Sequence, residues 1–185
     1  KSSFGNYLPF IKKNVDVKNI YVSSKKYGGV VFDCIHEIDY LIWLFGRVQS
    51  HNSIIKKLTN LKIKSEDFAS INLLHKNKIV SNIQLDFIKK IKERRLEIYG
   101  DNFSIIWTSI DKNPEKIKIF KLNKFKKNIK IFYKKYLNID SMYSEMLRDF
   151  LSTNKSKKEK FIKFKDFRHI LEIILNIKEG VNGIS

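Results

Sequence analysis

The chain has 185 residues, 43% of them hydrophobic, which is enough apolar material for the core of a single globular domain spanning residues 1–185. No apolar window is long enough for a membrane-spanning helix, and the N-terminal residues lack the apolar run of a signal peptide. We therefore expect a soluble, cytoplasmic protein with no membrane partner. The single cysteine, Cys34, lies in an apolar stretch, which agrees with a reducing compartment.

The formal net charge of +18 would suit a nucleic-acid partner, but the basic residues themselves argue against a specific one. Of the 37 basic residues, 32 are lysines and only five are arginines, whereas proteins that recognise base edges or phosphates favour the forked guanidinium of arginine. The lysines scatter along the chain, with local clusters at 121–135 and 154–160. A solvated basic surface is favoured, and a nucleic-acid-binding protein remains the third hypothesis.

Hydrophobic spacing predicts the elements in chain order. Residues 3–11 alternate as a strand does, with Pro9 near the end. From about Tyr27 to Phe45, apolar residues recur at helical spacing, which predicts one amphipathic helix capped by Gly46. Extended segments follow at 47–58, 67–76, 78–88, 94–100, 103–109, 115–122 and 128–134, with a tight turn around Asn77. Helical spacing returns at 141–153 and at 164–180, where Gly180 is the expected cap.

The extended segments carry the pattern of a sheet with one covered face. Apolar residues alternate with lysines at Ile117, Ile119, Ile129, Ile131 and Tyr133. The segregated order, a helix, then a run of strands, then two helices, predicts an α+β domain. We expect a largely antiparallel open sheet with helices on one face.

The first predicted helix contains polar residues that require an explanation. Within GGVVFDCIHEIDYLIWLFG (28–46), the residues Asp33, His36, Glu37 and Tyr40 fall on one stripe of the helix. A solvated stripe is the plain structural explanation. However, a histidine flanked by carboxylates can transfer protons, because an acidic partner orients the ring and adjusts its pKa.

The two glycines before this helix favour a binding site over a merely solvated stripe. Gly28 and Gly29 free the backbone to approach a ligand closely and expose amide groups at the positive end of the helix. Such an arrangement suits an anionic or hydroxyl-rich ligand, so both glycines are candidate substrate-binding residues.

The remaining chemistry-bearing residues give no further site. His51, His75 and His169 lack companions at metal-ligand spacing, so no metal site is predicted. Trp43 lies among apolar helix positions and Trp107 in a strand, which predicts packing roles for both. No G-x-S-x-G turn is present, which argues against a serine hydrolase.

The segment GGVVFDCIHEIDYLIWLFGRV (28–48) resembles the glycine-rich segment and following helix that open onto the active site in the Gfo/Idh/MocA family, the glucose-fructose oxidoreductase and inositol dehydrogenase group. The resemblance covers nearly the whole chain. Residues 4–29 are similar to the preceding stretch in members that act on sugars or nucleotide sugars. Residues 66–105 resemble the family's sheet with its RRLEIYG strand, and 143–151 and the final helix resemble its C-terminal helices.

The resemblance implies a two-domain dehydrogenase in which an N-terminal Rossmann domain binds NAD or NADP and the second domain binds a sugar, nucleotide sugar or polyol. This sequence contains no G-x-G-x-x-G after a strand and no Glu-Lys-Pro segment. We therefore expect a fragment that lacks the Rossmann domain, binds no cofactor alone and is inactive alone. A homo-oligomer formed through the sheet face is expected.

The resemblance also implies roles for residues of the 28–46 segment. His36 matches the catalytic histidine, which exchanges a proton with the substrate hydroxyl. Asp33 precedes the histidine by three residues, whereas the corresponding Asp of many members precedes it by four; the spacing here resembles that of a D-x-x-H-E-x-D subset. The resemblance implies that Asp33 is a catalytic partner of His36 or a substrate ligand. Asp39 matches the acid three residues after the histidine.

Two upstream residues are further candidate substrate contacts. Lys18 stands about where an arginine is common in the family, so a phosphate or carboxylate contact there would lose the bidentate geometry that arginine provides. Tyr21 is a candidate contact to a sugar or ring, and a structural role is the alternative. For the chain as a whole, the alternative to an enzyme domain is a noncatalytic binding or oligomerisation module of the same fold.

Overall fold

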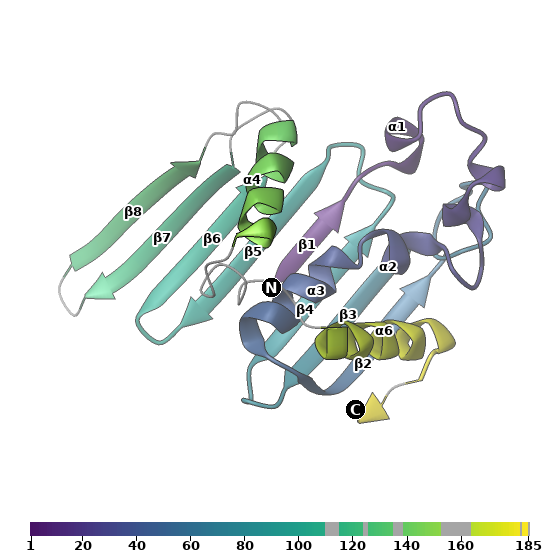
Figure 1. Cartoon of the computed structure of the whole chain (residues 1–185). Coiled ribbons are helices and arrows are strands. Elements are labelled where there is room, and N and C mark those ends of the chain that lie inside the picture. Colours follow the sequence, from purple (N-terminus) through teal and green to yellow (C-terminus); the bar gives the residue numbers. More distant parts are fainter. Residues whose placement is uncertain (110–114, 124–125, 135–138, 153–163, 182, 185) are drawn as a thin grey trace.

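The computed structural model describes residues 1–109, 115–123, 126–134, 139–152, 164–181 and 183–184 (Figure 1). The strands in these ranges are β1 Ser2–Gly5, β2 Val48–Lys56, β3 Phe68–His75, β4 Val80–Asp86, β5 Glu93–Gly100, β6 Phe103–Ser109, β7 Glu115–Asn123, β8 Lys126–Lys134 and β9 Gly183–Ile184. The helices are α1 Leu8–Ile11, α2 Gly29–Asp33, α3 His36–Phe45, α4 Ile139–Leu151 and α6 Phe164–Glu179, with short 3-10 turns at Val17–Asn19 and Tyr21–Ser23.

The nine described strands form one sheet in the order β8-β7-β6-β5-β1-β4-β3-β2-β9. Neighbouring strands are antiparallel except for β1 and β4, which run parallel. Helices α2, α3, α4 and α6 lie on the same face of the sheet (Figure 1). The expected α+β fold, a largely antiparallel open sheet with helices on one face, is therefore confirmed. The seven extended segments expected in succession are strands β2 to β8.

The first expected strand, 3–11, is wrong in its length. β1 ends at Gly5, and Leu8–Ile11 forms the short helix α1 with Pro9 in its first turn. Proline suits this position because the first helical amides have no partner within the helix. The chain leaves the sheet through two backbone bonds, from the Asn6 amide to the Asp86 carbonyl (3.1 Å) and from the Leu8 amide to the Phe87 carbonyl (3.3 Å).

The single helix expected from about Tyr27 to Phe45 is also wrong, because it is divided into α2 and α3. Cys34 leaves the helical region at φ −111° and ψ 27°. Its amide still bonds to the Val30 carbonyl (3.0 Å), and its carbonyl accepts from the Glu37 amide (3.0 Å), so the break is a tight connection. Helix α3 thus starts at His36 and ends at Phe45, and it is capped by Gly46, whose φ is +80°.

The buried apolar side chains of α3 lie on the face that the helical spacing predicts. Ile38, Leu41 and Ile42 of α3 face the core, whereas Trp43 is 54% exposed, so its expected packing role is wrong. Trp107 of β6 is partly buried against the core, as expected. The alternation expected at 117–133 and the lysine clusters at 121–135 and 154–160 fall on residues whose side chains, or whose whole placement, lie outside the described part of the chain.

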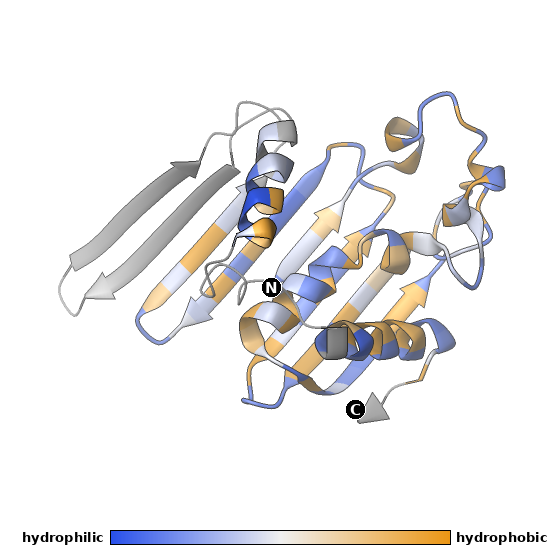
Figure 2. Ribbon diagram, viewed as in Figure 1, coloured by the Kyte–Doolittle hydropathy of each residue, from blue (hydrophilic) through white to orange (hydrophobic). Residues whose placement is uncertain are grey.

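The core lies between strands β2 to β4 and the helices above them. Figure 2 shows hydrophobic residues along these strands beneath α3 and α6. Helix α6 contributes four fully buried isoleucines, Ile170, Ile173, Ile174 and Ile177. Burying each such side chain contributes about 1.5–3 kcal/mol. This burial holds α6 against strands that come from much earlier residues of the chain. Among the described helices, none is long and apolar enough to cross a membrane.

Two buried histidines join elements at the edge of this core. One ring nitrogen of His75 lies 2.8 Å from the Gly46 carbonyl oxygen, and the other lies 2.9 Å from Ser81 Oγ. His169 Nε2 accepts a hydrogen bond from the Val48 amide (3.1 Å). Both rings therefore satisfy polar groups where α3 ends and β2 begins.

A buried ion pair ties α6 to the start of α2. Lys178 donates to the Glu66 carboxylate, and both side chains are buried. Lys178 also donates to the Gly28 carbonyl (2.9 Å), and Glu66 Oε1 accepts from the Val31 amide (3.2 Å). The pair thereby fixes the position at which α2 begins.

Replacing Lys178 by methionine is expected to lower the free energy of unfolding by about 3–5 kcal/mol, because it leaves the Glu66 carboxylate buried without its cation. Arg168→Met is the matched control on the same helix, since Arg168 pairs with Glu172 (2.9 Å) in solvent. The control should cost less than ~1 kcal/mol. Urea unfolding followed by circular dichroism measures both, and equally small losses would contradict the assigned role of the buried pair.

Candidate functional site

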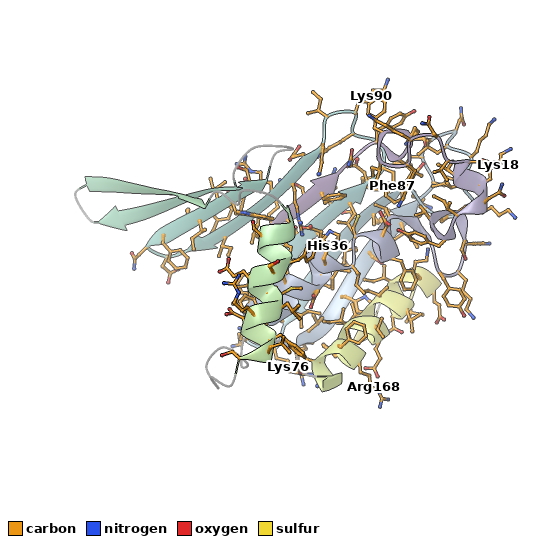
Figure 3. The ribbon with its side chains drawn as sticks, turned by 45° about the horizontal axis from the view of Figure 1, so that its top comes forward. Lys18, His36, Lys76, Phe87, Lys90 and Arg168 are labelled. Atoms are coloured by element: carbon orange, nitrogen blue, oxygen red, sulfur yellow. The ribbon has the colours of Figure 1, made fainter. Side chains whose placement is uncertain are left out.

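His36 is the first residue of α3 and lies above the middle of the sheet (Figure 3). Its ring packs edge-on against Phe4 of β1, with centroids 5.9 Å apart and planes at 86°. The side chain remains 42% exposed. The break before α3 therefore presents His36 to solvent while one side of the ring is held by the sheet.

Beneath His36, the carboxylate of Glu37 is completely buried. Its Oε2 accepts hydrogen bonds from Ser2 Oγ (2.7 Å) and the Tyr40 hydroxyl (2.5 Å). Its Oε1 accepts from Arg94 Nε (2.7 Å) and lies 3.5 Å from His36 Nε2. The donors come from β1, α3 and β5, so this one carboxylate joins the helix to the two central strands.

Aromatic rings surround the charged pair. The Arg94 guanidinium lies over the Trp107 ring at 5.2 Å from its centroid, and the Tyr40 ring meets Trp107 edge-on at 6.4 Å. Burial, followed by the charge of Glu37 and the hydrogen bond to it, raises the pKa of the Tyr40 hydroxyl. Tyr40 therefore stays protonated at neutral pH and donates its hydrogen to Glu37.

The environment of His36 favours a neutral imidazole. Burial lowers its pKa below 6.5, and the positive charge of Arg94 lowers it further, whereas Glu37 and Asp33 oppose the shift. A neutral ring at pH 7 can accept a proton from a ligand hydroxyl. Partial exposure gives a ligand access to the ring. The arrangement is therefore suited to proton transfer.

Asp33 and Tyr21 come together on the outer side of α2. The Tyr21 hydroxyl donates to Asp33 Oδ1. This hydrogen bond is the main cause that raises the pKa of Tyr21 to about 12. Tyr21 is 59% exposed and Asp33 is partly buried. The pair offers a hydroxyl and a carboxylate together to a polar ligand near the start of α3.

Asp39 lies in the first turn of α3 and is partly buried. Burial raises the pKa of its carboxyl group. Its Oδ1 is buried without a hydrogen-bond partner among the described residues. An unpartnered buried oxygen is costly, so Asp39 is a group that a ligand or a further segment of protein would satisfy.

Lys18 is not brought to His36. It lies in the 3-10 turn Val17–Asn19, is exposed, and stands at the edge of the molecule well away from His36 (Figure 3). Its backbone amide donates to Asp16 Oδ1 (3.1 Å). Within this chain, Lys18 and His36 do not share a surface.

Gly28 and Gly29 face protein atoms. A Cβ added at Gly28 would overlap the backbone of residues 21–22, and one added at Gly29, where φ is +88°, would overlap the Glu66 carboxylate. The amides of Val30 and Val31 donate to Glu66 as well, at 3.2 Å each. The amides that the sequence suggested would be open to a ligand are therefore occupied by Glu66.

Sequence reasoning missed Arg94 and Ser2 as parts of the site. Arg94, Leu96 and Ile98 share the covered face of β5, because alternate residues of a strand point the same way. An arginine on a covered face requires a buried acid nearby, and this alternation was the signal that could have identified it. For Ser2 the sequence holds no such signal.

The described residues include no group of three or more His, Cys, Asp or Glu side chains that could hold a metal ion. His51 is buried, and burial lowers the pKa of its ring. Both ring nitrogens of His51 are buried without a hydrogen-bond partner among the described residues.

The fold is shared by solved oxidoreductases. An NAD-binding oxidoreductase from Klebsiella pneumoniae matches with a TM-score of 0.67 at 11% identity, over 97% of this chain and 54% of its own. The UDP-N-acetylglucosamine 3-dehydrogenase GnnA from Acidithiobacillus ferrooxidans matches with 0.63 at 14%, over 97% and 53%. Biliverdin reductase from Synechocystis, solved with biliverdin and NADP+, matches with 0.64 at 12%, over 97% and 54%.

The fold is therefore one found in nicotinamide-dependent oxidoreductases, and this chain spans about half the length of those solved proteins. Residues 12–181 match the family model described as the oxidoreductase family, C-terminal alpha/beta domain, of the Gfo/Idh/MocA group. The chain belongs to this family and corresponds to its C-terminal domain, so the resemblance inferred from the sequence is confirmed. No curated protein matches the sequence.

Gly29→Ala is expected to destabilise the domain more than Gly180→Ala, because both glycines have positive φ but only Gly29 faces a buried side chain. The positive φ costs about 1–2 kcal/mol at either position. The overlap with Glu66 should add a further ~1–3 kcal/mol at Gly29. Urea unfolding of the two variants measures the difference, and equal losses would show that Glu66 moves aside freely.

Proposed function

We propose that this chain is the substrate-binding domain of an NAD- or NADP-dependent oxidoreductase in which His36 exchanges a proton with a substrate hydroxyl. The observation that carries the proposal is the partly exposed, neutral imidazole at the start of α3, held from below by Phe4 and Glu37. Family membership supports the reaction class.

In the direction of alcohol oxidation, His36 accepts the hydroxyl proton as the carbon loses a hydride. The proton and the hydride leave together, because loss of the proton alone would give an alkoxide and loss of the hydride alone would give a protonated carbonyl cation. Both species are strongly disfavoured. The nicotinamide, when bound, supplies the hydride acceptor. Asp33 is proposed as the second catalytic residue, acting through its negative charge, which favours protonation of His36.

The cofactor is assigned to an N-terminal Rossmann domain outside these 185 residues, which contain no glycine-rich dinucleotide fingerprint of their own. The solved relatives support this assignment, since the chain covers only 53–54% of their length. Sequencing the coding region upstream of Lys1 tests the assignment. A G-x-G-x-x-G segment following a strand is expected there, and an unrelated upstream sequence would overturn the enzyme proposal.

A sugar, nucleotide sugar or polyol is the proposed substrate class. Tyr21, Asp33 and Asp39 supply hydroxyl and carboxylate groups suited to several neighbouring hydroxyls. The dehydrogenase GnnA acts on a nucleotide sugar, and another structural relative is a levoglucosan dehydrogenase solved with NADH. Lys18, Gly28 and Gly29 remain proposed contacts, although the backbone of residues 21–22 fills the space beside Gly28 and the Glu66 carboxylate fills the space beside Gly29.

A homo-oligomer through the open sheet face is part of the proposal. On that face, Asn72 bridges Asn52 and Asn82 of the neighbouring strands through side-chain hydrogen bonds of 2.9 and 2.6 Å. The residues between these strands and β5 on the same face are also polar, including Ser3, Gln84 and Arg95. The same face also exposes Ile54 and Val80, so it offers both hydrogen-bonding and apolar groups to a second copy.

In the complete enzyme, His36→Ala is expected to reduce turnover by at least ~10²-fold while nicotinamide binding stays near normal, because proton transfer is lost but the cofactor pocket is untouched. His36→Gln is the matched variant, since glutamine keeps a polar side chain but exchanges no proton. Both should lose turnover alike with a panel of UDP-sugars, aldoses and inositols, followed by nicotinamide absorbance. Normal turnover of His36→Gln would remove His36 from the mechanism.

A further inference from the structure

Glu37, the residue after His36, is a buried carboxylate with an unusually complete set of partners. It accepts one hydrogen bond each from Ser2, Tyr40 and Arg94, while its Oε1 faces His36 Nε2 at 3.5 Å. A carboxylate buried in this way is stable only where cations and donors replace its water. Ser2, Tyr40 and Arg94 supply these donors and the cation from the side of Glu37 that faces the sheet. The His36 imidazole lies on the side of Glu37 that faces solvent.

The distance to the imidazole distinguishes Glu37 from Asp33 as the acidic partner of His36. Asp33 accepts the hydroxyl of Tyr21 and its charge acts on His36 less strongly than that of Glu37, whereas Glu37 lies at ion-pair distance. At 3.5 Å the interaction is electrostatic, and it strengthens when the ring gains a proton. Glu37 is also fixed, because its three donors come from different elements.

We propose that Glu37 is the positioning residue of His36 and that Arg94 is the cation that holds Glu37 in place. The inference rests on the proposed function, in which His36 exchanges a proton with the substrate. Glu37 orients the ring and stabilises the imidazolium that forms when His36 accepts that proton. Arg94 limits this stabilisation, so that the ring can release the proton again.

The charges that face His36 are Glu37 from α3, Asp33 from α2 and Arg94 from β5, while β1 contributes the uncharged ring of Phe4. Burial is the largest influence on the ring and lowers its pKa. Glu37 raises the pKa and Arg94 lowers it. Removing one charge at a time should therefore move the pKa of His36 in opposite directions, which a purely structural pair would not require.

The first test is an NMR titration of the His36 ring in this chain, with the resonance assigned by its loss in His36→Gln. Glu37→Gln is expected to lower the pKa of His36, and Arg94→Gln to raise it. Arg95→Gln is the matched control, because Arg95 is the next residue of β5 but pairs with Glu97 (2.6 Å) on the opposite face. Shifts of the same sign, or none, would overturn the proposal.

Arg94→Lys guards against the loss of folding in the charge-removing variants. Lysine keeps the positive charge beside Glu37, so the pKa of His36 should stay near its wild-type value while Arg94→Gln shifts it. If Glu37→Gln does not fold, the difference in His36 pKa between Arg94→Gln and Arg94→Lys still tests the electrostatic link. A His36 pKa that moves equally in both Arg94 variants contradicts that link.

The second test is the pH profile of turnover in the complete enzyme, with UDP-sugars, aldoses and inositols as probes. Glu37→Gln is expected to reduce kcat by roughly 10- to 100-fold with little change in KM, since the ring loses its orientation but the substrate contacts remain. Alcohol oxidation needs neutral His36, so kcat/KM falls as pH drops through the pKa of His36. This acidic limb should move to lower pH in Glu37→Gln and to higher pH in Arg94→Gln.

The two levels of the proposal fail in different ways. If His36→Gln retains full turnover, the proposed function fails even when the NMR shifts have the expected signs. If His36→Gln is inactive but Glu37→Gln keeps wild-type kcat and pH profile, His36 remains the proton carrier and the role given to Glu37 is wrong.

Discussion

The buried carboxylate of Glu37 is the interaction on which the centre of this domain depends. It gathers donors from Ser2 on β1, Tyr40 on α3 and Arg94 on β5. β1 lies between β4 and β5 in the sheet, so the three donors surround the place where α3 crosses the central strands. Without a buried acid there, the Arg94 guanidinium would lack its anion and keep only its contact with the Trp107 ring, and α3 would lose its polar link to the sheet.

A second buried carboxylate plays the matching role at the other end of the glycine-rich segment. The Glu66 carboxylate accepts from the Val31 amide and the Lys178 ammonium, and the Glu66 main-chain carbonyl accepts from the Val30 amide. Gly29 is required because the Glu66 side chain fills the space beside it. The 28–46 segment is therefore fixed at both ends, with Glu66 at the start of α2 and Glu37 at the start of α3. His36 lies between solvent and the second anchor, which explains how a partly exposed ring can be well oriented.

The sequence was sufficient for the order of elements, the fold class and the caps at Gly46 and Gly180, because these follow from local spacing and turn chemistry. It could not place Glu37 correctly, since the donors that make its burial favourable lie far away in the sequence at Ser2 and Arg94. The break at Cys34 was missed because the apolar spacing continues through it. Trp43 is exposed because it lies outside the buried face of α3 set by Ile38, Leu41 and Ile42.

The polar residues of the segment thus divide according to the cost of leaving them unpaired. Glu37 and Glu66 each have several donors and belong to the fold, whereas the Asp39 Oδ1 is buried without a partner among the described residues. The Tyr21 hydroxyl donates to Asp33, and the Lys12 ammonium lies over the Tyr21 ring at 5.5 Å from its centroid. A stable fold satisfies its own buried groups, so an incompletely satisfied group indicates where another molecule or domain completes the structure. Near the start of α3 these groups are Asp39 and the Tyr21–Asp33 pair, and on β2 both ring nitrogens of the buried His51 also lack a partner among the described residues.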